Sequence, residues 1–295
     1  MANASIDPGL KNPHTDEASA FVEHALMNDL GLRVGYVWKK DYDGWQQVNV
    51  LRPFSAYNIP VSIVDPGPDG VAGNADDGPA FAGLNLDDTT RGSSQVTQNI
   101  PGYEGTYKTF EISANKRYSN RWSLVASYSY TWTNEFGNNY FSNRIATAVS
   151  QFSFFGSYPV NPNEHTHNDY TNWNAKVHGT VDAGWGMHLT PVLKMQSGAP
   201  YGRVITGRFN YNTSQILLVE PLGTRRQDNI VVFDLRTEKQ IRFGDKGKVG
   251  LFLDVYNLTN ANTAININWR SGATFERATT VMPPRIAKFG VKFDW

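Results

Sequence analysis

An Asp- and Gly-rich segment at residues 65–78 carries the most pointed chemistry in this sequence. Calcium takes about six to eight oxygen ligands in a flexible loop, and carboxylate and amide side chains supply them. Glycines between the acidic residues let the backbone wrap around an ion. The spacing is not that of an EF-hand, because no Glu stands at the twelfth position. We predict a weak calcium site, with a solvated turn as the alternative, from Asp65, Asp69, Asn74, Asp76 and Asp77.

The remaining residues do not assemble into a catalytic constellation. The sequence has no Cys, which excludes disulfides, Cys-based zinc sites and thiol catalysis. No nucleophile stands with a base and an orienting partner, and no Gly-rich phosphate loop follows a strand pattern. We therefore expect a protein that is not an enzyme and that has no cofactor apart from the possible calcium.

In the segments that position these residues, apolar and polar residues alternate with a period of two. Over residues 284–295, apolar side chains alternate with charged or small ones, which predicts a strand with one apolar and one polar face. The same alternation predicts nine strands near residues 15–27, 31–41, 104–118, 122–134, 170–182, 187–198, 230–243, 248–259 and 284–295. Many are far longer than the five or six residues that are about typical of soluble sheets. They match the length of about 9 to 11 residues that a tilted strand needs to cross a membrane.

The connections between these strands alternate between very short and very long. Tight turns with Gly, Asn or Asp join one set of strand ends. The other ends carry long loops at about residues 42–103, 135–169, 199–229 and 260–283. Aromatic side chains end the apolar faces, as in the girdles at lipid interfaces. The sequence thus predicts an all-β, antiparallel transmembrane β-barrel segment with short periplasmic turns and long extracellular loops, and 42–103 is one of these loops.

The strand count bears on whether this barrel is complete. Nine strands, with the N-terminus on the loop side, do not make a complete bacterial barrel, which normally has an even number. We interpret the chain as the truncated C-terminal part of a larger barrel. A competing count omits 15–27 and leaves eight strands, enough for a small closed barrel.

Charged side chains fill the polar faces of the last strands, and we call this set the charged ladder. Its members are Asp234, Arg236, Glu238, Arg242, Asp254, Lys288 and Lys292. We interpret them as cross-strand pairs inside a polar lumen. Contact with a plug or a passing solute is the alternative.

Composition narrows the class of protein further. With 27 Lys and Arg against 27 Asp and Glu, the net charge is zero, which excludes nucleic-acid binding through a broad basic field. An apolar content of 40% excludes a solvated, disordered chain. The first residues do not form a secretory signal, and no run of about 18 apolar residues predicts a spanning helix.

Several segments resemble one family when they are taken together. They are residues 107–132, 196–201, 233–239, 254–261 and 283–295. In these segments the chain resembles TonB-dependent outer-membrane receptors, and most closely the Oar-like branch with its carboxypeptidase-regulatory-like domain. The resemblance covers nearly all of residues 10–295. It implies a barrel of about 22 strands around a plug. This chain looks like the last nine strands and lacks the plug, the TonB box and the signal peptide.

The resemblance implies a function in the cell outer membrane of a Gram-negative bacterium. The chain would supply barrel wall and extracellular loops for TonB-energised uptake of a siderophore, oligosaccharide or peptide. Its expected partners are outer-membrane lipid, the nutrient, the TonB complex through the missing plug, and the barrel-assembly machinery. That machinery would read a terminal signal consisting of Phe289, Val291, Phe293 and Trp295. The alternatives are a small passive, porin-like barrel and a soluble all-β carbohydrate-binding module.

Overall fold

A nine-stranded antiparallel sheet dominates the computed structural model, which describes residues 3–137, 166–243 and 247–294. Neighbouring strands follow the order β2-β3-β8-β9-β10-β11-β16-β17-β20. Their bounds are β2 (His14–Met27), β3 (Leu30–Tyr42), β8 (Glu104–Ser119), β9 (Trp122–Gly137), β10 (Thr166–Gly184), β11 (Met187–Gln196), β16 (Ile230–Phe243), β17 (Gly247–Tyr256) and β20 (Ile286–Asp294). All nine predicted strands are confirmed, including the one at 15–27 that the eight-strand count omitted.

Strand register places the alternating residues on two continuous faces. In β17 and β20, Leu251 lies opposite Val291 and Leu253 lies opposite Phe289, so the apolar residues of both strands share one face. Asp254 lies opposite Lys288 on the other face. A shift of one residue would exchange the two faces, so the period of two fixes the register. We call these the apolar face and the polar face.

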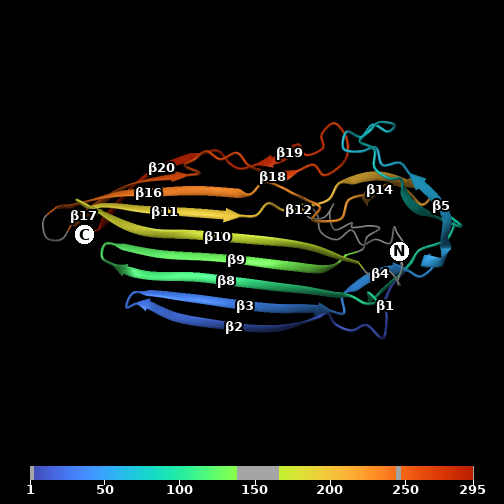
Figure 1. Ribbon diagram of the computed structural model, residues 1–295, viewed down its shortest axis with the longest axis horizontal. Helices are drawn as coiled ribbons and strands as arrows, with labels where there is room; N and C mark the ends of the chain where they lie inside the picture. The colour runs from blue at the N-terminus through green and yellow to red at the C-terminus, as the bar shows by residue number, and fades with distance from the viewer. Residues whose placement is uncertain (1–2, 138–165, 244–246, 295) are drawn as a thin grey trace.

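Short turns join the strands at the end of the sheet that holds the C-terminus (Figure 1). The turn between β8 and β9 has Asn120 and Arg121 at φ of 48° and 71°. Two successive positive φ values match the right-handed twist of a hairpin, and Asn tolerates this conformation well. The turn between β10 and β11 uses Gly184 and Gly186 at positive φ in the same way.

The long connections gather at the opposite end of the sheet and contain short strands of their own (Figure 1). We define the loop assembly as residues 43–103, 197–229 and 257–285. Its elements are β4 (Trp45–Asn49), a 3₁₀-helix (Phe54–Ala56), β5 (Tyr57–Ile63), β6 (Phe81–Leu86), β7 (Ser94–Asn99), β12 (Pro200–Tyr201), β13 (Val204–Phe209), β14 (Asn212–Leu218), β15 (Arg225–Arg226), β18 (Ala264–Ile267) and β19 (Ala278–Val281). The N-terminal strand β1 (Asn3–Ile6) joins it by pairing in parallel with β7.

The clusters of buried apolar side chains in the described residues lie in the loop assembly rather than in the main sheet. Ile205, Phe209 and Leu217 form one cluster, against which residues of β5 and β6 pack. Leu86 belongs to a second cluster, and Tyr211 packs against both. The sequence-based description of 42–103 as a loop therefore missed two small sheets and a shared core.

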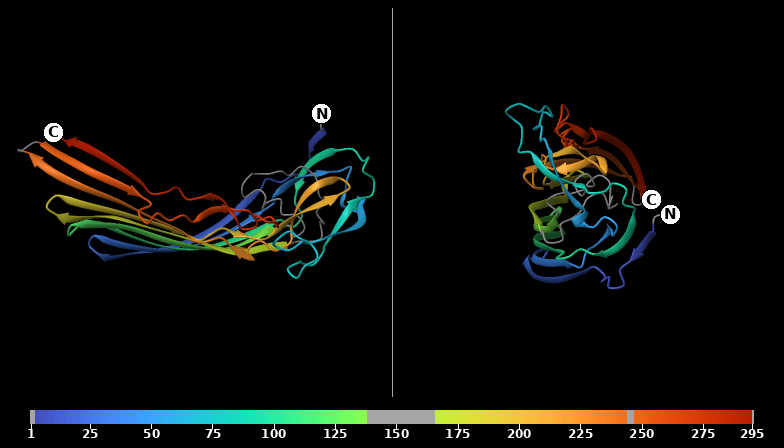
Figure 2. Two further views of the ribbon diagram at one scale, coloured as in Figure 1. Left: turned by 90° about the horizontal axis from the view of Figure 1, so that it is seen from above. Right: turned by 90° about the vertical axis from the view of Figure 1, so that its right-hand side faces the viewer.

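The main sheet curves into an open arc (Figure 2). Strands β2 and β20 are its two edges, and neither outer edge pairs with another described strand. No helix among the described residues is long and apolar enough to cross a membrane.

Candidate functional site

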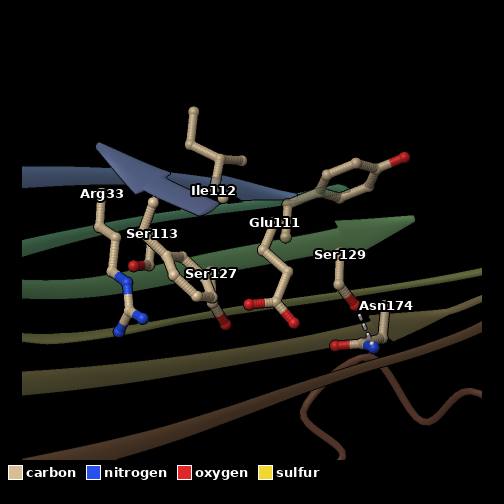
Figure 3. Close-up of a pocket in the computed structure, with 10 residues that line it drawn as sticks. Arg33, Glu111, Ile112, Ser113, Ser127, Ser129 and Asn174 are labelled. Atoms are coloured by element: carbon tan, nitrogen blue, oxygen red, sulfur yellow. Dashed lines mark hydrogen bonds between the residues drawn. The ribbon is translucent and has the colours of Figure 1, made fainter. Parts of the chain in front are cut away.

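A cavity of about 230 Å³ opens over residues of β2, β3, β8, β9 and β10 on the polar face. Figure 3 shows the Arg33 and Glu111 side chains on one side of the sheet, with Ile112 pointing to the other. This follows from the alternation of side chains along β8. The polar residues that line the cavity are Arg33, Glu111, Ser113, Ser127, Ser129 and Asn174.

A glycine in β3 shapes one wall of this cavity. Phe21 of β2 lies opposite Gly35 and covers it, because a Cβ at position 35 would lie only 2.2 Å from Cδ1 of the ring. The Arg33 guanidinium lies over the same ring, with Cζ 4.0 Å from the ring centroid. The missing side chain at Gly35 thus lets Phe21 lie against the sheet and support the arginine.

Neutral hydrogen-bonding groups cover the adjoining wall. Asn174 Nδ2 donates to Ser129 Oγ at 2.7 Å across β9 and β10. Beside the cavity, the Thr109 and Thr131 hydroxyls form a hydrogen bond of 2.9 Å across β8 and β9. Glu111 lies opposite Ser129 in the register. No hydrogen bond or ion pair within the described residues engages the Glu111 carboxylate. The cavity therefore combines a guanidinium from β3, a carboxylate from β8, and hydroxyls from β8 and β9.

The charged ladder is only partly paired. Arg236 and Asp254 form a bidentate pair across β16 and β17, at 2.5 and 2.8 Å. Asp234 pairs with Lys194 at 3.2 Å, a partner that the sequence pattern did not suggest. Lys292 pairs along its own strand with Asp294 at 3.2 Å.

The other ladder residues have neighbours rather than ion partners within the described residues. Glu238 accepts a hydrogen bond from Gln240 at 3.0 Å. Arg242 lies opposite Lys248, and Lys288 lies opposite Asp254 without a contact in ion-pair range. Within the described part of the chain, the structure thus has cross-strand pairs for Arg236 with Asp254 and for Asp234 with Lys194, and none for the other ladder residues.

Three residues of the expected assembly signal lie on the apolar face of the edge strand β20. Phe289, Val291 and Phe293 leave 67%, 44% and 62% of their surface exposed. Trp295 lies outside the described residues. Exposed apolar side chains in unbroken alternation are costly in water but favourable against hydrocarbon.

Residues from all three parts of the loop assembly meet at a buried arginine. The Arg203 guanidinium donates to both carboxylate oxygens of Asp65, at 2.5 and 2.7 Å, and the two side chains are only 5% and 2% exposed. Its Nε donates to Glu220 at 3.1 Å, and its Nη1 donates to Ser271 Oγ at 2.9 Å. We call this network the loop latch, because it joins residues from all three parts of the loop assembly.

A second arginine extends the latch toward solvent. Arg225 bridges Glu220 at 2.7 Å and Glu276 at 2.9 Å, and Glu276 also accepts a hydrogen bond from the Tyr201 hydroxyl at 2.7 Å. Burial raises the pKa of Glu220, but the hydrogen bonds from Arg225 and Arg203 outweigh it and hold that pKa below its usual value. Burial and Glu276 raise the pKa of Tyr201, so its hydroxyl stays a donor.

The latch changes the interpretation of the Asp- and Gly-rich segment. Asp65 is separated from the other candidate ligands because Arg203 binds both of its oxygens. Asp69, Asn74, Asp76 and Asp77 accept backbone N–H donors within the segment, at 2.6 to 3.4 Å. The described residues contain no group of three or more His, Cys, Asp or Glu that could hold a metal ion. Calcium binding by the remaining four residues stays a prediction.

Of three comparisons with known proteins, only the one with solved structures returned matches. No family model matches the sequence. No curated protein matches it either. Among solved structures, the chain is similar to the outer membrane transporter YddB from Escherichia coli, with 12% identity, a TM-score of 0.47 and coverage of 99% of this chain and 34% of that one.

Two further structures have lower scores. The ferric-catecholate import receptor Fiu from E. coli K12 has 11% identity, a TM-score of 0.37 and coverage of 96% and 38% of the two chains. A Pseudomonas aeruginosa FadL homologue has 9% identity, a TM-score of 0.30 and coverage of 88% and 52%. The chain spans about a third of the length of the first two structures.

Sequence reasoning missed both the cavity and the latch. Glu111 stands at a polar position of a predicted strand, but its neighbours come from four other strands. Arg203 is 138 residues from Asp65 in the chain, and no periodic pattern links them. The available signal for the cavity was a set of small polar residues at alternate positions of two neighbouring predicted strands, namely Thr109, Ser113, Ser127, Ser129 and Thr131.

Proposed function

We propose that this chain is part of the wall of an outer-membrane transport receptor. One observation supports the membrane part of this proposal above others. Nine antiparallel strands of 9 to 19 residues share a continuous face of exposed apolar side chains. Strands of about 9 to 11 residues already span a bilayer, and lipid removes the cost of exposing that face.

The polar face then lines the lumen, and the loop assembly lies outside the cell. In hydrocarbon, the open edges of β2 and β20 would leave backbone N–H and C=O groups without partners. We therefore include further strands beside both edges in the proposal, so that the wall closes. Phe289, Val291 and Phe293 would then face lipid and carry the signal for the barrel-assembly machinery.

The finer part of the proposal is TonB-energised uptake of a nutrient. It rests on the resemblance of residues 107–132, 196–201, 233–239, 254–261 and 283–295 to TonB-dependent receptors. In such a receptor this chain would hold the outer wall and the loops, while a plug contacts TonB. Uptake by the receptor that contains this wall would stop when the TonB complex is removed.

Two single-cysteine variants of β20 test the membrane part of the proposal. The chain has no Cys, so Phe289→Cys places the only thiol on the apolar face, and Lys288→Cys places it on the polar face. In outer-membrane vesicles, we expect a lipid-soluble maleimide to label Phe289→Cys and a water-soluble one to label Lys288→Cys. Equal labelling of both positions by the water-soluble reagent would overturn the proposal, as would a monodisperse chain without detergent.

A further inference from the structure

The Glu111 carboxylate differs from most acidic groups on the polar face. Glu17 pairs with Lys39 at 2.9 Å, and Asp254 pairs with Arg236 at 2.5 Å. Glu111 makes no such contact with any described residue and lies at the edge of the cavity. Its neighbours across the strands are Gly35, which has no side chain, and Ser129. A carboxylate in this setting is an open acceptor for a cationic group.

Arg33 supplies the opposite charge on the same wall. Its Nε is 3.5 Å from Glu23, a long contact to a side chain that is 72% exposed. The ring of Phe21 holds the guanidinium plane over the cavity. Its terminal nitrogens make no hydrogen bond with the described residues, and they form the planar fork that binds a carboxylate.

Between the two charges lie hydroxyls with unused capacity. Ser113 and Ser127 face each other across β8 and β9, and neither hydroxyl bonds to a described residue. Such hydroxyls can accept from an ammonium group and donate to a carbonyl. The volume of about 230 Å³ is below the range of about 300 to 1,000 Å³ that is usual for drug-sized ligands, so it suits a small polar molecule.

The position of Phe21 also disfavours a sugar as the ligand. Sugar rings are held by stacking on an open aromatic face, but Phe21 lies against Gly35 and beneath Arg33. Tyr128 also lines the cavity, but its ring is not available there. The ring lies on the apolar face and stacks with Trp173, with the two centroids 6.3 Å apart. No free aromatic face therefore remains in the cavity.

We propose that this cavity is a subsite for a zwitterion the size of one or two amino-acid residues. The ammonium group binds Glu111 with help from the serine hydroxyls, and the carboxylate binds Arg33. The subsite rests on the proposed function, because it lies on the path of a transported solute only if the polar face lines the lumen of a barrel. It narrows the nutrient class to amino acids or the termini of short peptides.

Calorimetry on the full chain in detergent micelles tests the subsite with three probes. The probes are L-alanyl-L-alanine, its N-acetylated amide without either charge, and maltose. We expect only the free dipeptide to bind. Glu111→Gln and Arg33→Gln should each weaken that binding about tenfold or more, because each removes one charge-assisted contact.

Glu238→Gln is the matched control, since it removes a carboxylate from the polar face outside the cavity and should bind as the unmodified chain does. Absence of dipeptide binding at millimolar concentration, equal binding of the capped probe, binding of maltose instead, or unchanged binding by Glu111→Gln would each overturn the subsite. The cysteine labelling of Phe289→Cys and Lys288→Cys is independent of these results. A failed subsite with correct labelling leaves the membrane proposal standing.

Discussion

Leu86 and Leu217 in the loop assembly expose none of their surface, whereas Leu253 and Val291 in the main sheet expose 41% and 44%. Both regions are made of strands with alternating apolar residues. In the loop assembly, small sheets pack on each other and remove these residues from water. In the main sheet, a whole face is left uncovered. The loops therefore bury their apolar side chains against one another, whereas the apolar side chains of the sheet have no covering layer within the described residues.

The same contrast holds for charge. The loop latch buries the Arg203 guanidinium with the Asp65 carboxylate, and several hydrogen bonds hold this pair and the partly exposed Glu220. On the sheet, Glu17 and Lys39 pair at 2.9 Å, but their side chains stay 49% and 47% exposed. A buried pair is costly to break because the remaining charge has no water to solvate it. An exposed pair contributes little, because water replaces the lost partner.

Breaking the latch should have the largest effect. Arg203→Ala leaves Asp65 and Glu220 without their buried partner, and we expect a loss of about 3–5 kcal/mol in the stability of the loop assembly. Lys39→Ala is the matched change on the sheet, because it removes one partner of an ion pair that is exposed on both sides, and we expect a loss of about 1 kcal/mol or less. Hydrogen exchange in β13 and β3 measures the two regions separately. Equal losses would remove the distinction between a buried and an exposed pair.

The next largest effect should come from the apolar cores. Leu217→Ala leaves a void in a fully buried cluster, which we expect to cost the loop assembly about 2–5 kcal/mol. Leu253→Ala removes the same atoms from the apolar face of β17, where we expect about 1 kcal/mol or less. Protease resistance of the loops and heat-modifiable migration of the barrel in gels report on the two regions. If Leu253→Ala were the more damaging change, the sheet rather than the loops would hold the structural core.

A smaller effect should follow from acid. The folded pKa of Glu220 is below its ordinary value of 4.5, so its contribution is fully present above that value and is lost as the pH falls through the lower, folded value. We expect the thermal midpoint of the loop assembly to be constant between about pH 7 and pH 5 and to fall on further acidification. Near-UV circular dichroism follows this midpoint. Glu220→Gln should flatten the acid limb, and an unchanged limb would contradict the assignment to Glu220.

The smallest effect should lie in the turns of the sheet. Asn120 has a φ of 48°, and Asn120→Ala should cost about 1 kcal/mol because an Ala Cβ is strained in this region. Asn120→Gly should change the stability by no more than about 0.3 kcal/mol, because Gly adopts positive φ freely. Urea unfolding in detergent compares the two variants. Equal stabilities would show that the turn does not constrain the hairpin.

The sequence predicted the main sheet well because each of its strands keeps one apolar face and one polar face along its length, so the alternation of residue types continues without interruption. Residues 284–295 show this, since the alternation alone assigned every side chain of β20 to its face. The loop assembly has no such uniform surroundings. Its strands are short, and Asn210, for example, binds both backbone groups of Leu86, 124 residues away. The cavity at Glu111 likewise depends on the register of five strands, which no single segment encodes.

The separation of 138 residues between Asp65 and Arg203 also orders the events of folding. Hairpins such as β8 with β9 close over two or three residues, so the entropy lost in forming them is small. The latch closes over a span that contains β8, β9, β10 and β11. Contacts of such long range form late. Protease resistance of the surface loops should therefore develop only after these hairpins have paired. Formation of the latch then reports that the strands of the main sheet have assembled.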